Sequence, residues 1–154
     1  SVPPSGGPTV VVDYAHTPDG LEELLETARP LSAGGRLRVV FGCGGERDHA
    51  KRPVLGRIAQ RLADVMVVTS DNARREDPER IIDDIVGDLD RRYGARLIRN
   101  ADRRAAIASA LEASTTDDVV VIAGKGHETT QDLGSRVVDF DDRVVVRELL
   151  EDPS

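Results

Sequence analysis

The loop of residues 69–78 carries the side chains best suited to bind a small charged ligand. Asn72 offers an amide that donates and accepts hydrogen bonds, and Arg74 offers a planar guanidinium that can hold a carboxylate with two hydrogen bonds. The loop follows an apolar run and ends at Asp77 and Pro78, a good N-cap and a good first residue of a helix. An amide and a guanidinium group together are suited to bind a small zwitterion. A solvated turn would use the same residue types, so the loop alone leaves both interpretations open.

Three further groups of unusual polar side chains each follow a short apolar run. They are Asp13 with His16, Arg47 with Lys51 and Arg52, and Lys125 with His127 and Glu128. In open parallel sheets, ligands bind outside the carboxyl ends of the strands. Because all four groups fall at such ends, we expect a binding site on one rim of the sheet. Asp13 and His16 could there hold a ribose hydroxyl and a phosphate, or could cap the following helix, and this choice stays open.

The elements that must position these groups alternate five times between strand and helix. Apolar runs predict strands at 9–14, 37–41, 65–68, 96–98 and 119–123, and helical spacing predicts helices from Pro18, through 54–62, over 78–89, after Asp102 and over 141–150. This pattern predicts an α/β fold, an open, mostly parallel sheet with helices on both faces. Residues 136–138 suggest an edge strand near the C-terminus. Residues 1–8 are expected to be a flexible lead-in that looks like a cut end, and 9–154 a single domain.

Composition excludes several classes of protein. The 154 residues are 39% hydrophobic and 32% charged, and no apolar run approaches the ~20 residues that span a bilayer. A net charge of −7, with no Trp and two each of Tyr and Phe, argues against a nucleic-acid partner. Cys43 is the single cysteine, so no internal disulfide can form, which fits a cytoplasmic protein. Any anionic ligand must therefore be met by a local cluster of Arg and Lys.

Three motifs that could carry chemistry are incomplete. Gly124-Lys125-Gly126 is similar to the end of a P-loop, but Gly126 stands where Ser or Thr is needed and Val119 where the first glycine is needed. No two histidines share a helix at ligand spacing, so we expect no metal site. Nothing marks a general base for Cys43, so we expect a bystander thiol. The sequence thus predicts no catalytic residue in this chain alone.

Four motifs, taken together and in order, resemble one family. They are residues 13–19 (DYAHTPD), 41–48 (FGCGGERD), 71–78 (DNARREDP) and 123–128 (AGKGHE). They resemble the C-terminal domain of the Mur ligases, and within these the diaminopimelate-adding branch, over nearly the whole chain from Thr9. The resemblance implies a Rossmann-like module that closes over two others, an N-terminal domain that holds the UDP-sugar and a central domain that carries the P-loop.

The resemblance implies an ATP-dependent amide ligation in peptidoglycan precursor synthesis, with ATP and Mg²⁺ bound largely outside this chain. Its substrates would be UDP-MurNAc-L-Ala-D-Glu and meso-diaminopimelate. The family's amino-acid pocket falls on Arg47, Asn72, Arg74, Gly124 and Glu128, and its ATP contacts from this module fall on Asp13 and His16. The two arginines could meet carboxylates while the glutamate accepts from the distal ammonium group. Lys125 and His127 receive no role.

One departure bears on specificity, because Ala73 stands where the family usually has proline. Proline fixes φ, so alanine is expected to loosen the loop while leaving Asn72 and Arg74 in place. Diaminopimelate is still favoured over lysine, which lacks the second carboxylate that Arg74 would bind. The alternatives are a lysine-adding or other Mur or folylpolyglutamate-type ligase module, and a stand-alone amino-acid-binding domain.

Overall fold

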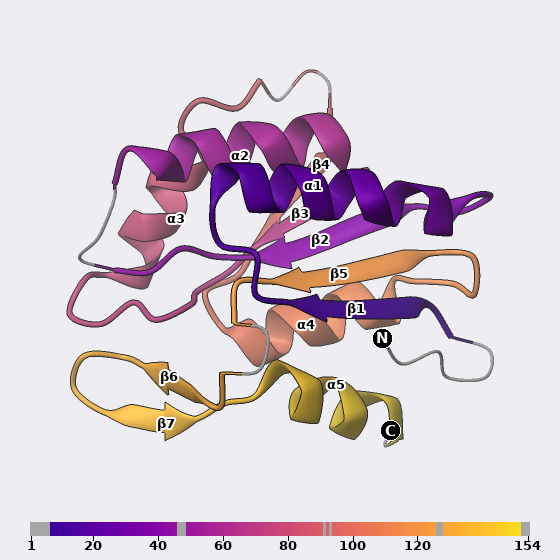
Figure 1. Cartoon of the computed structure of the whole chain (residues 1–154). Coiled ribbons are helices and arrows are strands. Elements are labelled where there is room, and N and C mark those ends of the chain that lie inside the picture. Colours follow the sequence, from indigo (N-terminus) through magenta and orange to yellow (C-terminus); the bar gives the residue numbers. More distant parts are fainter. Residues whose placement is uncertain (1–6, 46–48, 91, 93, 126–127, 152–154) are drawn as a thin grey trace.

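The structure is a computed structural model that describes residues 7–45, 49–90, 92, 94–125 and 128–151. Its centre is a five-stranded sheet in the order β1-β5-β2-β3-β4, and every pairing is parallel (Figure 1). The strands are β1 (Thr9–Asp13), β2 (Leu37–Phe41), β3 (Val65–Val68), β4 (Arg96–Arg99) and β5 (Val119–Ala123). The predicted open parallel sheet is confirmed. All five carboxyl ends therefore meet at one rim.

Helices cover both faces of the sheet, as the sequence predicts (Figure 1). One face packs against α1 (Pro18–Ala28), α2 (Lys51–Leu62) and α3 (Pro78–Val86), and the other against α4 (Arg103–Glu112) and α5 (Asp142–Glu151). A short 3-10 helix, η1 (Arg29–Ser32), follows α1. Because successive side chains of a strand point to opposite faces, Val39 and Phe41 join one core and Val40 joins the other.

Local signals fix where three helices begin. The side chain of Thr17 accepts from the Gly20 N–H at 3.2 Å, Asp77 accepts from Glu79, and Asp102 accepts from Ala105. Each cap satisfies a backbone donor that the first helical turn leaves unpaired. Helix α3 ends three residues before the predicted Leu89, because Gly87 weakens its continuation.

The predicted edge strand near the C-terminus is wrong in its pairing. A strand forms at β7 (Val137–Asp139), but it pairs antiparallel with β6 (Thr130–Asp132) in a separate two-stranded sheet, and β1 and β4 are the edges of the main sheet. The chain reverses at Gly134, whose φ of 85° suits glycine. A strand of three residues contains too little pattern to specify its partner. Within the part of the chain described here, no helix is long and apolar enough to cross a membrane.

Candidate functional site

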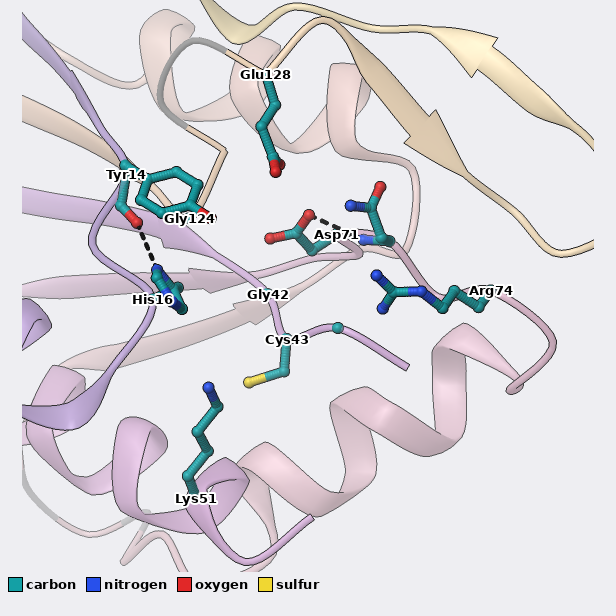
Figure 2. Close-up of a pocket in the computed structure, with 11 residues that line it drawn as sticks. Tyr14, His16, Gly42, Cys43, Lys51, Asp71, Arg74, Gly124 and Glu128 are labelled. Atoms are coloured by element: carbon teal, nitrogen blue, oxygen red, sulfur yellow. Dashed lines mark hydrogen bonds between the residues drawn. The ribbon is translucent and has the colours of Figure 1, made fainter. Parts of the chain in front are cut away.

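A pocket opens at the carboxyl rim of the sheet, between the loops that follow β1, β2, β3 and β5 (Figure 2). It is lined by Tyr14, His16, Gly42, Cys43, Gly44, Lys51, Asp71, Asn72, Arg74, Gly124 and Glu128. All four loops singled out by their polar residues thus contribute to one site. Of the five predicted diaminopimelate-binding residues, the structure brings together Asn72, Arg74, Gly124 and Glu128, whereas Arg47 lies outside the described residues.

The loop of residues 69–77, named the recognition loop for its proposed role, contributes Asn72 and Arg74 to the lining of this pocket. Figure 2 shows the Arg74 guanidinium directed into it. Asp71 is buried, and its carboxylate accepts from the Asn72 N–H at 2.8 Å. Arg74 has a φ of 55°, a left-handed conformation that few side chains adopt, and its Nη1 donates to the Gly45 carbonyl at 3.2 Å. The N–H of Ala73 donates to the Asp71 carbonyl, a bond that proline in this position could not make.

The glycine-rich loop after β2 packs directly on the recognition loop. The Gly45 N–H donates to the Asn72 carbonyl at 2.7 Å, and a Cβ at residue 45 would lie 1.8 Å from the Ala73 carbonyl oxygen. A Cβ at Gly42 would lie 2.3 Å from the Thr69 carbonyl oxygen. Glycine is therefore required at these two positions by the close approach of the recognition loop.

Arg52 supports the pocket from below. It is fully buried, and its guanidinium binds Glu76 at 2.7 and 2.8 Å, Asp84 at 2.9 Å and the Gly44 carbonyl at 3.1 Å. The hydrogen bonds that Arg52 donates, above all those to Glu76, raise the pKa of its guanidinium group. Arg52, which the sequence places with Arg47 and Lys51 at the rim, therefore does not line the pocket. Lys51, its neighbour, does point into the pocket (Figure 2).

Two carboxylates near Arg52 bear on metal binding. His49, Glu76 and Asp84 each place a possible ligand atom within 4.8 Å of the others. Both carboxylates bind the Arg52 guanidinium, so a metal ion there would have to displace a buried cation. Glu76 and Asp84 are therefore close together because both bind Arg52.

Cys43 lines the pocket but is unsuited to act as a nucleophile. Burial raises the pKa of its thiol to about 12, although Arg52 and Lys51 act in the opposite direction. The thiol therefore stays protonated at neutral pH, and the thiolate is the reactive form.

The β1 end supplies the residues predicted to approach ATP. Asp13 accepts from the Ala15 N–H at 2.9 Å, and His16 Nδ1 lies 2.9 Å from the Tyr14 carbonyl oxygen. Asp13 lies in a second depression, toward α1, that shares Tyr14 and His16 with the pocket. Sequence reasoning missed Tyr14, which stands edge-on to the His16 ring at a centroid distance of 4.6 Å. Its position between two singled-out residues was the available signal.

The β5 end supplies Gly124 and Glu128. Gly124 has a φ of 116°, and a Cβ there would lie 2.8 Å from an Asp71 carboxylate oxygen. Glu128 is half-buried and directs its carboxylate into the pocket (Figure 2). Lys125, for which the sequence predicts no role, is fully buried. Its Nζ lies 3.9 Å from Oε1 of Glu128 and donates to the Thr130 carbonyl. His127 lies outside the described residues.

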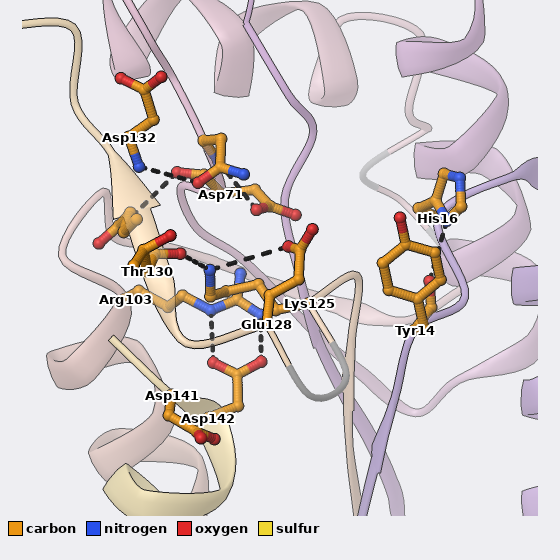
Figure 3. A network of polar contacts seen from close by, with 12 residues as sticks. Tyr14, His16, Asp71, Arg103, Lys125, Glu128, Thr130, Asp132, Asp141 and Asp142 are labelled. Atoms are coloured by element: carbon orange, nitrogen blue, oxygen red, sulfur yellow. Dashed lines mark hydrogen bonds and ion pairs between the residues drawn. The ribbon is translucent and has the colours of Figure 1, made fainter. Parts of the chain in front are cut away.

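A buried ion pair that the sequence did not reveal joins the β3 and β5 ends (Figure 3). The Arg103 guanidinium binds both Asp142 oxygens at 2.8 and 2.7 Å and donates to the carbonyls of Ser70 and Ala123 at 3.0 and 3.4 Å. Arg103 and Asp142 are almost completely buried. Burial opposes the charge on Arg103, but the hydrogen bonds with Asp142 outweigh it and raise the pKa. The pair fixes the residues that directly precede Asp71 and Gly124.

The pocket can therefore hold a ligand with charges of both signs. The cations come from Arg74 after β3 and Lys51 after β2, and the carboxylates come from Asp71 after β3 and Glu128 after β5. Such an arrangement fits a zwitterion better than a phosphate alone, because the carboxylates would repel a simple anion.

Comparison with known proteins shows the family of this chain. Residues 2–126 match the model of the family described as Mur ligase, glutamate ligase domain. The chain is 53% identical over 141 residues to the UDP-N-acetylmuramoyl-L-alanyl-D-glutamate–2,6-diaminopimelate ligase of Syntrophomonas wolfei, covering 92% of this chain and 29% of that protein. The protein of the same name from Gloeobacter violaceus is 55% identical over 141 residues, covering 92% of this chain and 28% of that protein. The chain thus spans less than a third of these relatives.

Solved structures point the same way. A structure of UDP-N-acetylmuramoyl-L-alanyl-D-glutamate–2,6-diaminopimelate ligase superposes with a TM-score of 0.85 at 43% identity, over 92% of this chain and 29% of that one. A bifunctional folylpolyglutamate synthase/dihydrofolate synthase from Yersinia pestis superposes with a TM-score of 0.56 over 75% of this chain and 25% of that one. At 20% identity, this similarity shows the fold alone. Because the family model matches residues 2–126 and the identity to the Syntrophomonas and Gloeobacter relatives exceeds half, the chain belongs to the Mur ligase family and comprises its glutamate ligase domain.

Proposed function

We propose that this chain is the amino-acid-binding module of an ATP-dependent ligase that adds meso-diaminopimelate to UDP-MurNAc-L-Ala-D-Glu. The observation that carries the proposal is the convergence of Asn72, Arg74 and Glu128, from the ends of two strands, on one pocket. Diaminopimelate has two carboxylates and two ammonium groups. Asn72 and Arg74 would hold the carboxylate that lysine lacks, and Glu128 would accept from the distal ammonium group. The names of the relatives support this substrate.

The chemistry of this reaction is the formation of an amide bond. ATP phosphorylates the D-glutamyl carboxylate, the amine of diaminopimelate attacks the acyl phosphate carbon, and phosphate leaves. The residues of this chain would hold the amino acid so that its amine faces that carbon, which lowers the entropic cost of the attack.

This chain would contact only part of the ATP molecule. His16, Tyr14 and Lys51 offer an imidazole, an exposed ring and a cation along the two connected depressions, which fits contact with a nucleotide and its phosphates. Asp13 and His16 would approach the ribose and phosphates. No Walker A sequence occurs in the chain, so the γ-phosphate and Mg²⁺ would be held by the other domains of the same polypeptide. We expect the complete enzyme to act in the cytoplasm.

The test is Arg74→Ala in a full-length ligase that carries this domain. We expect the KM for diaminopimelate to rise about 10- to 100-fold, because a charge-assisted hydrogen bond contributes roughly 1.5–3 kcal/mol, and the KM for ATP to change little. The preference for diaminopimelate over L-lysine should narrow. Arg80→Ala, an exposed arginine in the first turn of α3, is the matched control.

Two results would contradict the proposal. One is an Arg74→Ala enzyme whose KM for ATP rises while that for diaminopimelate stays constant. The other is ATP-dependent ligation by these 154 residues alone, which would refute the assignment as a module. Tight calorimetric binding of diaminopimelate to the isolated chain, without ligation by any longer form, would favour a stand-alone binding domain instead.

A further inference from the structure

The β6–β7 hairpin packs along the recognition loop, although 60 residues of sequence separate the contacting groups (Figure 3). Gln131 is buried, and its Nε2 donates to the Asp71 carbonyl at 2.9 Å and to Ser70 Oγ at 3.1 Å. The hairpin also lies outside residues 2–126, which the family model matches. Contacts of this kind, from a buried amide to a loop backbone, fix the conformation of that loop.

The first consequence concerns Asn72. Its side-chain oxygen accepts from the Asp132 N–H at 2.9 Å. An amide has one oxygen and one NH₂ group, so binding the oxygen to the hairpin leaves the NH₂ group, which can only donate, for a ligand. Asn72 is thereby set to face a carboxylate rather than an ammonium group.

The second consequence concerns Arg74. Its N–H donates to the Asp132 carbonyl at 2.9 Å, and a Cβ at Gly134 would lie 2.2 Å from the Arg74 carbonyl oxygen. A left-handed conformation is unfavourable for arginine, and it persists only where surrounding structure enforces it. The hairpin contacts the Arg74 backbone at both its N–H and its carbonyl group, and these contacts hold the left-handed conformation.

The hairpin also contacts the opposite wall of the pocket. Lys125, next to Gly124, donates from its buried ammonium group to the Thr130 carbonyl of β6. One two-stranded element therefore contacts both the loop that carries Arg74 and the loop that carries Glu128.

We propose that the β6–β7 hairpin is the positioning element for amino-acid selectivity, with Gln131 and Gly134 as positioning residues that act through Asn72 and Arg74 without touching the ligand. The inference rests on the proposed function, since it explains how the same pocket acquires a face for a carboxylate.

The experiment uses Gln131→Leu in a full-length ligase carrying this domain. The leucine keeps the volume of the side chain and removes both donors. We expect the KM for diaminopimelate to rise about 10-fold, the KM for ATP to stay within about 2-fold, and the selectivity against L-lysine to fall by about the same factor as the affinity. Val137→Thr, an exposed position of the same hairpin, is the matched control and should change none of these values.

A second variant keeps the test decisive if Gln131→Leu fails to fold. Gly134→Ala introduces a Cβ against the Arg74 carbonyl from the tip of the hairpin, outside both hydrophobic cores, and should produce the same split between the two KM values. Unchanged selectivity in a folded variant of either kind would overturn the inference. If Arg74→Ala still weakens diaminopimelate binding in that case, the proposed function stands and only the positioning role of the hairpin fails.

Discussion

The two sides of the rim are held in different ways. Asn72 and Arg74, on the side proposed to bind the amino acid (the amino-acid side), are fixed by contacts with a hairpin about 60 residues away in sequence. The Asp13 carboxylate and the His16 ring, on the side proposed to meet the nucleotide (the nucleotide side), instead contact backbone groups two residues away in their own turn. A side chain held by distant parts of the fold keeps its position before a ligand arrives, whereas one held by its own turn depends on what binds it. The amino-acid side is thus preorganised, and the nucleotide side is suited to completion by another domain.

Burial follows the same division. Beneath the amino-acid side lies the Arg103–Asp142 pair, almost completely buried, whereas Tyr14 on the nucleotide side is 48% exposed. Preorganised charges bind a ligand with less reorganisation, which improves affinity and selectivity. An exposed side of a pocket contributes little to ligand affinity until a second surface covers it. Closure of another domain would supply that surface.

The largest effect should come from the support beneath the amino-acid side. Asp142→Asn keeps the shape of the side chain but leaves the Arg103 guanidinium buried without its carboxylate. Breaking one partner of a buried ion pair costs about 3–5 kcal/mol, so we expect a loss of this size in the free energy of unfolding, measured by urea denaturation of the isolated domain.

A control for this variant joins the same two helices. Glu148 binds Arg104 at 2.8 Å, with both side chains about half exposed, and Glu148→Gln should cost under about 1 kcal/mol. Equal losses for the two variants would show that burial does not distinguish these pairs, and the proposed support would then be in doubt.

An intermediate effect should come from the contact between the two loops. Gly45→Ala forces a methyl group against the Ala73 carbonyl, and overpacking of this kind costs about 1–3 kcal/mol. In the full-length ligase the same variant should raise the KM for diaminopimelate more than that for ATP. Gly34→Ala, at a turn with open space around it but a positive φ, separates the cost of backbone strain from the cost of collision.

The smallest effect on stability should come from the nucleotide side. His16→Ala removes an exposed side chain with a local contact, so the free energy of unfolding should change by under about 0.5 kcal/mol. The KM for ATP in the full-length ligase should nevertheless rise several-fold. A strongly destabilised His16→Ala domain would contradict the division between the two sides.

Sequence reasoning succeeded where the determining contacts are local. The apolar runs of β2, β3 and β5, the cap at Asp77 and the helix starts at Pro18 and after Asp102 depend on neighbouring residues, and each was predicted correctly. The rim itself follows from parallel topology, which the alternating pattern implies.

Sequence reasoning failed where the partner is distant. Arg52 belongs to a charged group at the start of α2, but its side chain turns inward to Glu76 and Asp84, 24 and 32 residues away. Asp142 and Arg103 are 39 residues apart, and nothing in either segment marks them as a pair. The packing of the hairpin on residues 69–77 was missed for the same reason, whereas its own pairing was missed because three-residue strands contain too little pattern. The diaminopimelate role of Arg47 stays a prediction.

The interlocked backbones of residues 42–45 and 69–77 limit how a different amino acid could be accepted. Exchange of the DNAR segment alone, by an engineer or by recombination, would bring in a loop whose carbonyls no longer match the glycines beside it. A transplant of substrate preference between ligases should therefore succeed only when three separate stretches, 42–45, 69–77 and 128–139, are moved together.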